Sequence, residues 1–91
     1  MTEYILDGEK MRTKKEAHEH IAAVLGFPEY YGHNLDALFD VLSERRRQSI
    51  KVVLTNGAAM REGLGAYGEL LVSCFEEAFV CHGGALFTEE N

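Results

Sequence analysis

Ile50-Lys51-Val52-Val53-Leu54 is a nearly continuous run of apolar and mostly β-branched residues within a chain of 91 residues. Branched side chains favour strands, and a run without polar alternation is typical of a strand that is covered on both faces. Asn56-Gly57 follows directly, and this dipeptide commonly ends a strand. The run therefore predicts the central strand of a sheet.

Two shorter strand signals lie near the two ends of the sequence. Tyr4-Ile5-Leu6 is closed by the turn signal Asp7-Gly8, and Ala85–Thr88 follows Gly83-Gly84. Helical patterns separate the three strands, and strands separated by helices usually pair in parallel. We therefore expect a single α/β domain over residues 1–91. It should be a three-stranded parallel sheet packed with three to four helices, in the order β-α-α-β-(α)-α-β.

The helical segments have recognisable ends. Thr13 is the expected N-cap of a first helix that stops at Gly26, and Asn34 is the expected N-cap of a second helix. Gly57–Gly68 holds four glycines, so we expect a loop with at most one helical turn near residues 58–62. The expected apolar faces are Leu35, Leu38, Phe39 and Leu42 in the second helix, and Tyr67, Leu70, Leu71, Cys74, Phe75, Ala78 and Cys81 in the last.

The charge balance limits the classes of partner. Fifteen acidic and nine basic residues give a net charge of −6, which argues against nucleic acid or an anionic membrane as the main partner. No apolar run approaches the roughly 18 residues of a membrane span, and no signal peptide is visible, so we expect a cytoplasmic protein. The acids gather in residues 29–44 and 69–91, which contain no base. This acidity is consistent with a cationic protein partner. It is equally consistent with a surface charge whose only role is to keep the protein soluble.

Metal, cofactor and enzyme sites find little support in the sequence. Cys74 and Cys81 would lie about 10.5 Å apart on one helix, beyond disulfide reach, so both are expected to be free thiols. His18 and His20 are two residues apart and face apart on a helix, and no metal-ligand spacing occurs. We therefore expect no metal and no cofactor. A small hydrolase that uses Asp36 and Asp40 as acid and base is the enzymatic alternative, although no His or Lys is placed to separate their pKa values.

The second helix carries a column of like charges. Asp36, Asp40 and Glu44 follow one another at i, i+4 and i+8, and each such pair destabilises a helix by about 0.2–0.5 kcal/mol. The loop before this helix places Tyr30 and Tyr31 side by side, and only one of them is expected to pack inward. An exposed tyrosine beside carboxylates is typical of a protein-binding hot spot. A solvated polar face beside a tyrosine that covers the core is the simpler interpretation.

The segment Pro28–Asp40, PEYYGHNLDALFD, closely resembles the signature of the barstar family, bacterial inhibitors of the ribonuclease barnase. The Phe75–Ala78 stretch is also similar to the family, so the resemblance covers nearly the whole chain. It implies a three-stranded parallel sheet with helices, which agrees with the element order above. It also implies an intracellular inhibitor that occludes the active site of a cationic ribonuclease. The second helix and the loop before it would enter this active site.

The resemblance implies a set of partner-binding residues and no catalytic ones. Asp40 would take the place of the substrate phosphate, Asp36 and Glu77 would pair with basic groups, and Tyr30 would cover the catalytic region. Gly32 and Asn34 would let the backbone approach closely, and Phe39 would add an aromatic contact. The inhibitor would be a monomer that forms a one-to-one complex with its ribonuclease.

Two departures from the family pattern bear on the choice of partner. Phe39 stands where the best-known member has a larger aromatic residue, which keeps the contact but loses a donor. Arg45, Arg46 and Arg47 follow the acid column and would repel a strongly basic nuclease. They either complement the negative end of the second helix or determine specificity. An adaptor that binds another cationic protein is therefore the alternative to a ribonuclease inhibitor.

Overall fold

The computed structural model describes residues 2–45, 47–79 and 84–90. Within these residues the chain forms three strands, four α-helices and one short 3-10 helix. The strands are β1 (Thr2–Asp7), β2 (Ile50–Thr55) and β3 (Leu86–Glu89). The helices are η1 (Gly8–Lys10), α1 (Lys14–Leu25), α2 (Leu35–Arg45), α3 (Gly57–Leu64) and α4 (Ala66–Phe79). The described residues contain no helix with the length and hydropathy of a membrane span.

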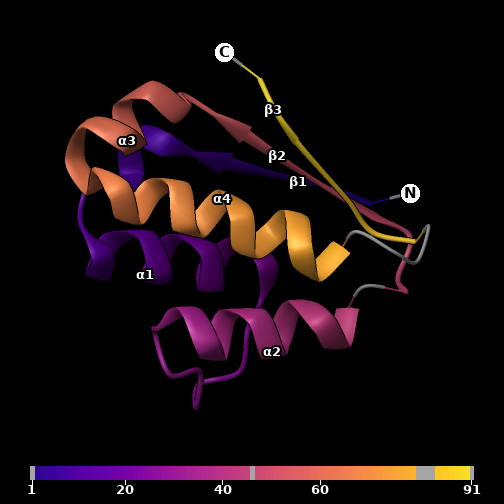
Figure 1. The fold of residues 1–91 in the computed structure, drawn as a ribbon. Coiled ribbons are helices and arrows are strands. Elements are labelled where there is room, and N and C mark those ends of the chain that lie inside the picture. The colour runs from indigo at the N-terminus through magenta and orange to yellow at the C-terminus, as the bar shows by residue number, and fades with distance from the viewer. Residues whose placement is uncertain (1, 46, 80–83, 91) are drawn as a thin grey trace.

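The sheet has the predicted parallel topology. β2 lies between β1 and β3 and pairs with both in parallel, with Thr2 opposite Ile50 and Val52 opposite Phe87. Figure 1 shows α1, α2 and α4 on the same side of the sheet. Val52 on β2 packs into this helical core, whereas Ile5 and Leu86 on the neighbouring strands are each 46% exposed. The central strand is confirmed, and the helices cover one face of the sheet.

Helix α1 has the predicted ends. The Thr13 hydroxyl accepts a hydrogen bond of 3.1 Å from the backbone N–H of Glu16, which caps the first turn. Gly26 ends the helix in the left-handed conformation, with φ of 68°. The buried face of the helix consists of Ala17, His18, Ile21 and Leu25.

The prediction of a loop over Gly57–Gly68 is wrong, because this segment forms α3 and the first turn of α4. Gly65, with φ of 60°, separates the two helices. Gly63 serves close packing, because a Cβ atom there would lie 2.2 Å from the carbonyl oxygen of Arg12. Glycine content signals flexibility only where nothing packs against the backbone, and here α3 lies against the segment that precedes α1.

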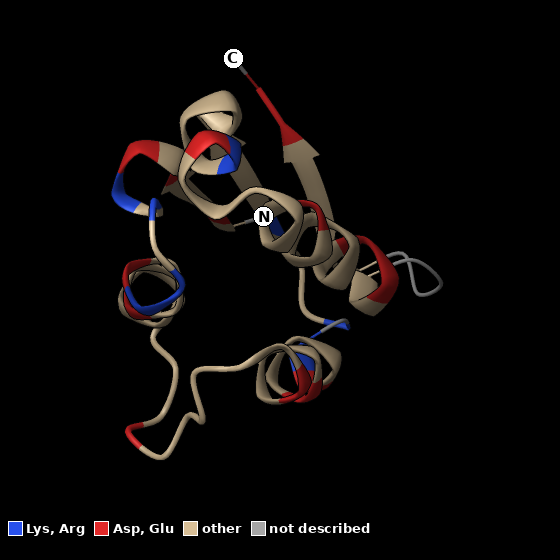
Figure 2. Ribbon diagram, turned by 60° about the vertical axis from the view of Figure 1, so that its left-hand side comes forward, with Lys and Arg blue, Asp and Glu red and all other residues tan. Residues whose placement is uncertain are grey.

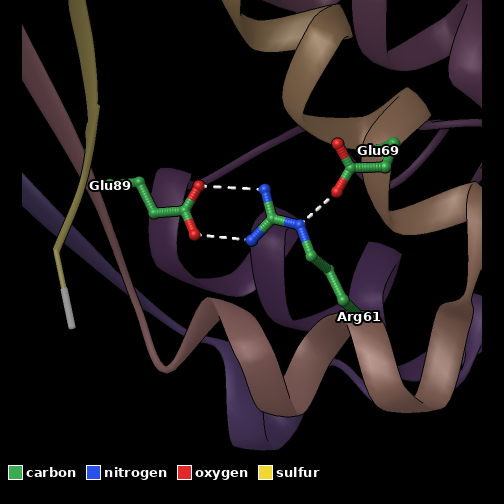
Figure 3. A network of polar contacts seen from close by, with 3 residues as sticks. All are labelled: Arg61, Glu69 and Glu89. Atoms are coloured by element: carbon green, nitrogen blue, oxygen red, sulfur yellow. Dashed lines mark hydrogen bonds and ion pairs between the residues drawn. The ribbon is translucent and has the colours of Figure 1, made fainter.

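Arg61 of α3 joins this glycine-rich region to the sheet (Figure 3). Its guanidinium donates two hydrogen bonds to Glu89 of β3 and one to Glu69 in the first turn of α4. Helices α3 and α4 are therefore joined to β3 by charged hydrogen bonds as well as by apolar packing.

Candidate protein-binding surface

The loop between α1 and α2 separates its two tyrosines as predicted. Tyr31 is 6% exposed and its ring packs edge-on against Phe27, with a centroid distance of 5.0 Å. Its backbone N–H donates to the carbonyl oxygen of Pro28 at 3.0 Å. Tyr30 is 88% exposed. The buried neighbour therefore anchors the loop, and Tyr30 is free to contact another molecule.

Asn34 holds the start of α2 and the end of the loop together. Its Oδ1 accepts from the backbone N–H of Ala37 at 2.8 Å, and its Nδ2 donates to the carbonyl oxygen of Gly32 at 3.1 Å. A Cβ atom on Gly32 would lie 3.2 Å from the Cβ of Ala37, so the turn is tightly packed. Asn34 is therefore an N-cap as predicted, and Gly32 lets the backbone pass close to α2.

The acidic column of α2 faces solvent. Asp36, Asp40 and Glu44 are all exposed. Among the described residues, the ion pairs involve only Arg61 with Glu69 and Glu89, so no basic side chain there neutralises the column. Figure 2 shows the acidic positions in red on α2 and on the neighbouring α4. The acidic column expected from the sequence therefore lies on the solvent-facing side of α2.

A groove between α2 and α4 brings several of the predicted site residues together. Its lining consists of Leu35, Asp36, Phe39, Leu70, Ser73, Cys74 and Glu77. Two apolar members are accessible, with Phe39 37% and Leu70 52% exposed. The groove thus joins Asp36, Phe39 and Glu77, whereas Tyr30, Gly32, Asn34 and Asp40 lie outside its lining.

Two residues of the groove differ from the apolar faces predicted from the sequence. Phe39 was expected in the inward stripe of α2, yet only Leu38 and Leu42 of that stripe are buried. Leu70 was expected in the inward face of α4, and it was absent from the predicted binding residues. Helical spacing gives the direction of a side chain but not the place where the contact with the neighbouring helix ends, so the spacing alone predicts neither exposure. For Phe39 the resemblance to the family had implied an accessible position, whereas nothing in the sequence indicated that of Leu70. Cys81 lies outside the described residues.

Cys74 closes the base of the groove. Its thiol lies 3.7 Å from the carbonyl oxygen of Leu35, and burial raises its pKa to about 11. Such a thiol is protonated and a poor nucleophile at neutral pH. Among the described residues there is also no cluster of three or more potential metal ligands.

Arg45 does not cap its own helix. Its guanidinium donates to the carbonyl oxygens of Leu25 and Gly26 at the end of α1, the latter at 3.3 Å, and it lies over the ring of Phe27. Arg45 therefore joins α1 to α2, and it also lies in the last turn of α2, where a cation complements the negative helix end as expected. A role of Arg45, Arg46 and Arg47 in the choice of partner stays a prediction. Arg47 is exposed, and Arg46 lies outside the described residues.

Comparison with known proteins gives this surface a context. The model of the family described as "Barstar (barnase inhibitor)" matches residues 1–84. The chain is also 33% identical over 78 residues to a Bacillus subtilis (strain 168) protein named "Putative ribonuclease inhibitor YrdF", and the match covers 86% of each chain. Because the family match covers most of the chain, with β1, β2, the loop and both helices of the groove, the chain belongs to the barstar family, whose proteins are inhibitors rather than enzymes.

Proposed function

We propose that the chain is a cytoplasmic inhibitor that binds a cationic ribonuclease one-to-one and occludes its active site with α2 and the loop 28–33. Membership of the barstar family and the name of the Bacillus subtilis relative support the ribonuclease inhibitor role. The observation that carries the proposal is the exposure of Tyr30, at 88%, in the loop that leads into α2, together with the exposed carboxylates of this helix, which form no ion pair with a described residue. Exposed aromatic residues of this kind commonly anchor protein interfaces.

The chemistry of the surface suits a nuclease active site. A ribonuclease binds substrate phosphates with cationic side chains, and the Asp40 carboxylate would occupy such a phosphate site. Asp36 and Glu77 flank the apolar part of the groove, where they would pair with surrounding basic groups. Phe39 and Leu70 would supply the apolar contact that excludes water from these charge pairs.

The repulsion along α2 also fits this role. Like charges cost the free protein stability, and a cationic partner relieves that cost when it docks. The net charge of −6 would in addition accelerate the encounter with a basic protein, and this effect should weaken as salt is added.

The test is inhibition of RNA cleavage by barnase, with the affinity measured directly by calorimetry. Wild type should inhibit, and Asp40→Ala should lose about 2 kcal/mol or more of binding free energy, as expected for a hot spot. Glu76 and Glu77 form a matched pair, because both are exposed acids on α4 and only Glu77 lines the groove. Glu77→Ala should therefore weaken binding more than Glu76→Ala.

Two outcomes would contradict the proposal. A loss below roughly 0.5 kcal/mol for Asp40→Ala would remove Asp40 from the interface. Binding of a basic protein without inhibition of any ribonuclease would favour the adaptor alternative.

A further inference from the structure

A buried histidine is held between two tyrosines beneath the proposed binding surface. His18 of α1 is 1% exposed. Its Nδ1 lies 2.6 Å from the hydroxyl of Tyr31, and its Nε2 lies 2.7 Å from the hydroxyl of Tyr67. A neutral imidazole has one N–H and one lone pair, so one tyrosine accepts a hydrogen bond from the ring while the other donates one to it. The neutral ring is therefore fully satisfied.

This arrangement connects the two elements that carry the proposed surface. Tyr31 belongs to the loop and is the direct neighbour of Tyr30. Tyr67 lies in the first turn of α4, the helix that contributes Leu70 and Glu77 to the groove. His18 thus links the position of the loop to that of α4 through two short hydrogen bonds.

A second histidine lies directly beside the first. The His33 ring stacks on His18 with a centroid distance of 6.3 Å and an interplanar angle of 26°. Its backbone is left-handed, with φ of 53°, a conformation that L-residues other than glycine adopt uncommonly. Packing against Tyr31, at 5.1 Å between centroids, helps to hold this residue in place.

The surroundings of His18 disfavour a positive charge. Burial lowers the pKa of His18 below its usual 6.5, and the nearby His33 lowers it further. Burial also raises the pKa values of Tyr31 and Tyr67, so both hydroxyls stay protonated. The titratable groups that face this cluster are Tyr31 and His33 from the loop, Lys14 over the Tyr67 ring, Tyr67 and Cys74 from α4, and Asp36 beside His33 and Tyr67.

Protonation of His18 would place a positive charge in a buried position and would also disrupt one of the hydrogen bonds to the tyrosines. An imidazolium donates from both nitrogens, so the tyrosine that donates to the neutral ring would have to turn its hydroxyl away. The pKa of His18 is lower in the folded than in the unfolded protein, so the network stabilises the fold fully above pH 6.5. This contribution is lost as the pH falls from 6.5 towards the folded-state value.

We propose that His18 is a positioning residue for the nuclease-binding surface: in its neutral form it fixes the Tyr30 loop against α4, and its protonation in mild acid releases the loop and weakens the complex. The inference rests on the proposed function for its effect on binding. The movement of the loop belongs to the free protein and can be measured without a partner.

The first experiment uses the free protein. The imidazole protons report the titration of each histidine by NMR, and exchange of the Tyr31 amide, which donates to Pro28, reports the closure of the loop. Protection of this amide should fall as His18 titrates, because the protonated ring no longer accepts a hydrogen bond from a tyrosine hydroxyl. His20→Gln is the matched control, because His20 lies on the same helix but accepts from the N–H of Asp7.

The variants make the expected pattern specific. The wild type and His20→Gln should show the same pH step, and His18→Gln should show none. Tyr67→Phe removes only the α4 link, so it should lower the Tyr31 protection near neutral pH even if His18→Gln fails to fold. A Tyr31 protection factor that stays constant while the wild-type His18 titrates would overturn the inference.

The second experiment measures the dissociation of barnase at about pH 7.5 and about pH 5.5, on either side of the usual histidine range. Because the same nuclease is used throughout, its own titrations cancel in the comparison. The loss of affinity between the two pH values should be larger for the wild type than for His18→Gln. Identical pH profiles would exclude His18 from the control of binding. If barnase binds at neither pH, the proposed function fails for this nuclease, while the Tyr31 exchange still decides the role of His18.

Discussion

Arg61 and Glu89 face each other through two parallel hydrogen bonds, with Nη1 2.5 Å from Oε2 and Nη2 3.0 Å from Oε1. Their side chains are each 31% exposed, so solvent only partly screens the pair. Lysine cannot reproduce the two-pronged contact. We expect Arg61→Lys to lower the free energy of unfolding by about 1 kcal/mol in urea melts. Glu90→Gln, at an exposed neighbouring position, is the control and should have no effect.

The same pair predicts a pH dependence of stability. The hydrogen bonds from Arg61 lower the pKa of Glu89 below its usual 4.5. A carboxylate with a lowered folded-state pKa stabilises the protein above the unfolded value and loses this effect as the pH falls. The difference in unfolding free energy between the wild type and Glu89→Gln should therefore be largest near neutral pH and shrink below pH 4.5. A difference that is independent of pH would mean that packing, not charge, determines it.

Arg45 and Arg47 should behave differently although they are only two residues apart, Arg45 at the end of α2 and Arg47 in the turn that follows. Arg45 donates to the carbonyl oxygens that end α1, so Arg45→Ala should cost about 1–2 kcal/mol of stability. Arg47 is exposed, and Arg47→Ala should stay within about 0.5 kcal/mol of the wild type. Thermal melts of the two variants distinguish these roles. Arg47→Glu leaves the contact with α1 intact and is therefore the cleaner probe of partner choice.

Removing a charge from the acidic column should not harm the free protein. Asparagine and aspartate have similar helix propensities, so Asp40→Asn mainly relieves i, i+4 repulsion. We expect Asp40→Asn to be as stable as the wild type or up to about 0.5 kcal/mol more stable in urea melts. Asp36→Asn should gain less, because Asp36 lies in the first turn, where the helix dipole favours a negative charge. Clear destabilisation by Asp40→Asn would show that this carboxylate is structural.

The Cys74 thiol should be inert until the protein unfolds. Burial raises its pKa to about 11, so little thiolate is present at neutral pH. Thiol titration of the native, unreduced protein should detect slow reaction of Cys74, and addition of urea should make the reaction fast. Rapid reaction in the native state would mean that the base of the groove opens readily.

The sequence predicted the architecture well because its strongest signals are local. The β-branched run at Ile50–Leu54 became the central strand, and the caps Thr13 and Asn34 make the expected hydrogen bonds. The separation of Tyr30 from Tyr31 was also predictable, since adjacent loop residues rarely point the same way. By contrast, the glycines of α3 wrongly predicted a loop. Their role is set by contacts such as that of Gly63 with Arg12, a residue 51 positions earlier in the chain.

Fewer features of the candidate surface could be predicted from the sequence. The acidic column follows from helical spacing alone, but the exposure of Leu70 depends on how α4 lies across α2. The spacing of His18 from His20 predicts no metal site and by itself indicates no other role for His18. Its position three residues before Ile21 and seven before Leu25 places it on the buried face of α1, which was a usable signal. Its tyrosine partners could not be identified, because Tyr67 is 49 residues away.

Parallel pairing of β1 with β2 also affects how the chain folds. Thr2 pairs with Ile50 and Asp7 with Thr55, so every contact of this pair closes a loop of 48 residues. Such loops lose chain entropy before they gain contacts, which slows folding relative to helical contacts between near neighbours. During synthesis β1 must therefore wait, with Tyr4, Ile5 and Leu6 unpaired, until β2 has left the ribosome. In that interval β1 is an apolar strand with an unpaired backbone, and segments of this kind are prone to aggregation.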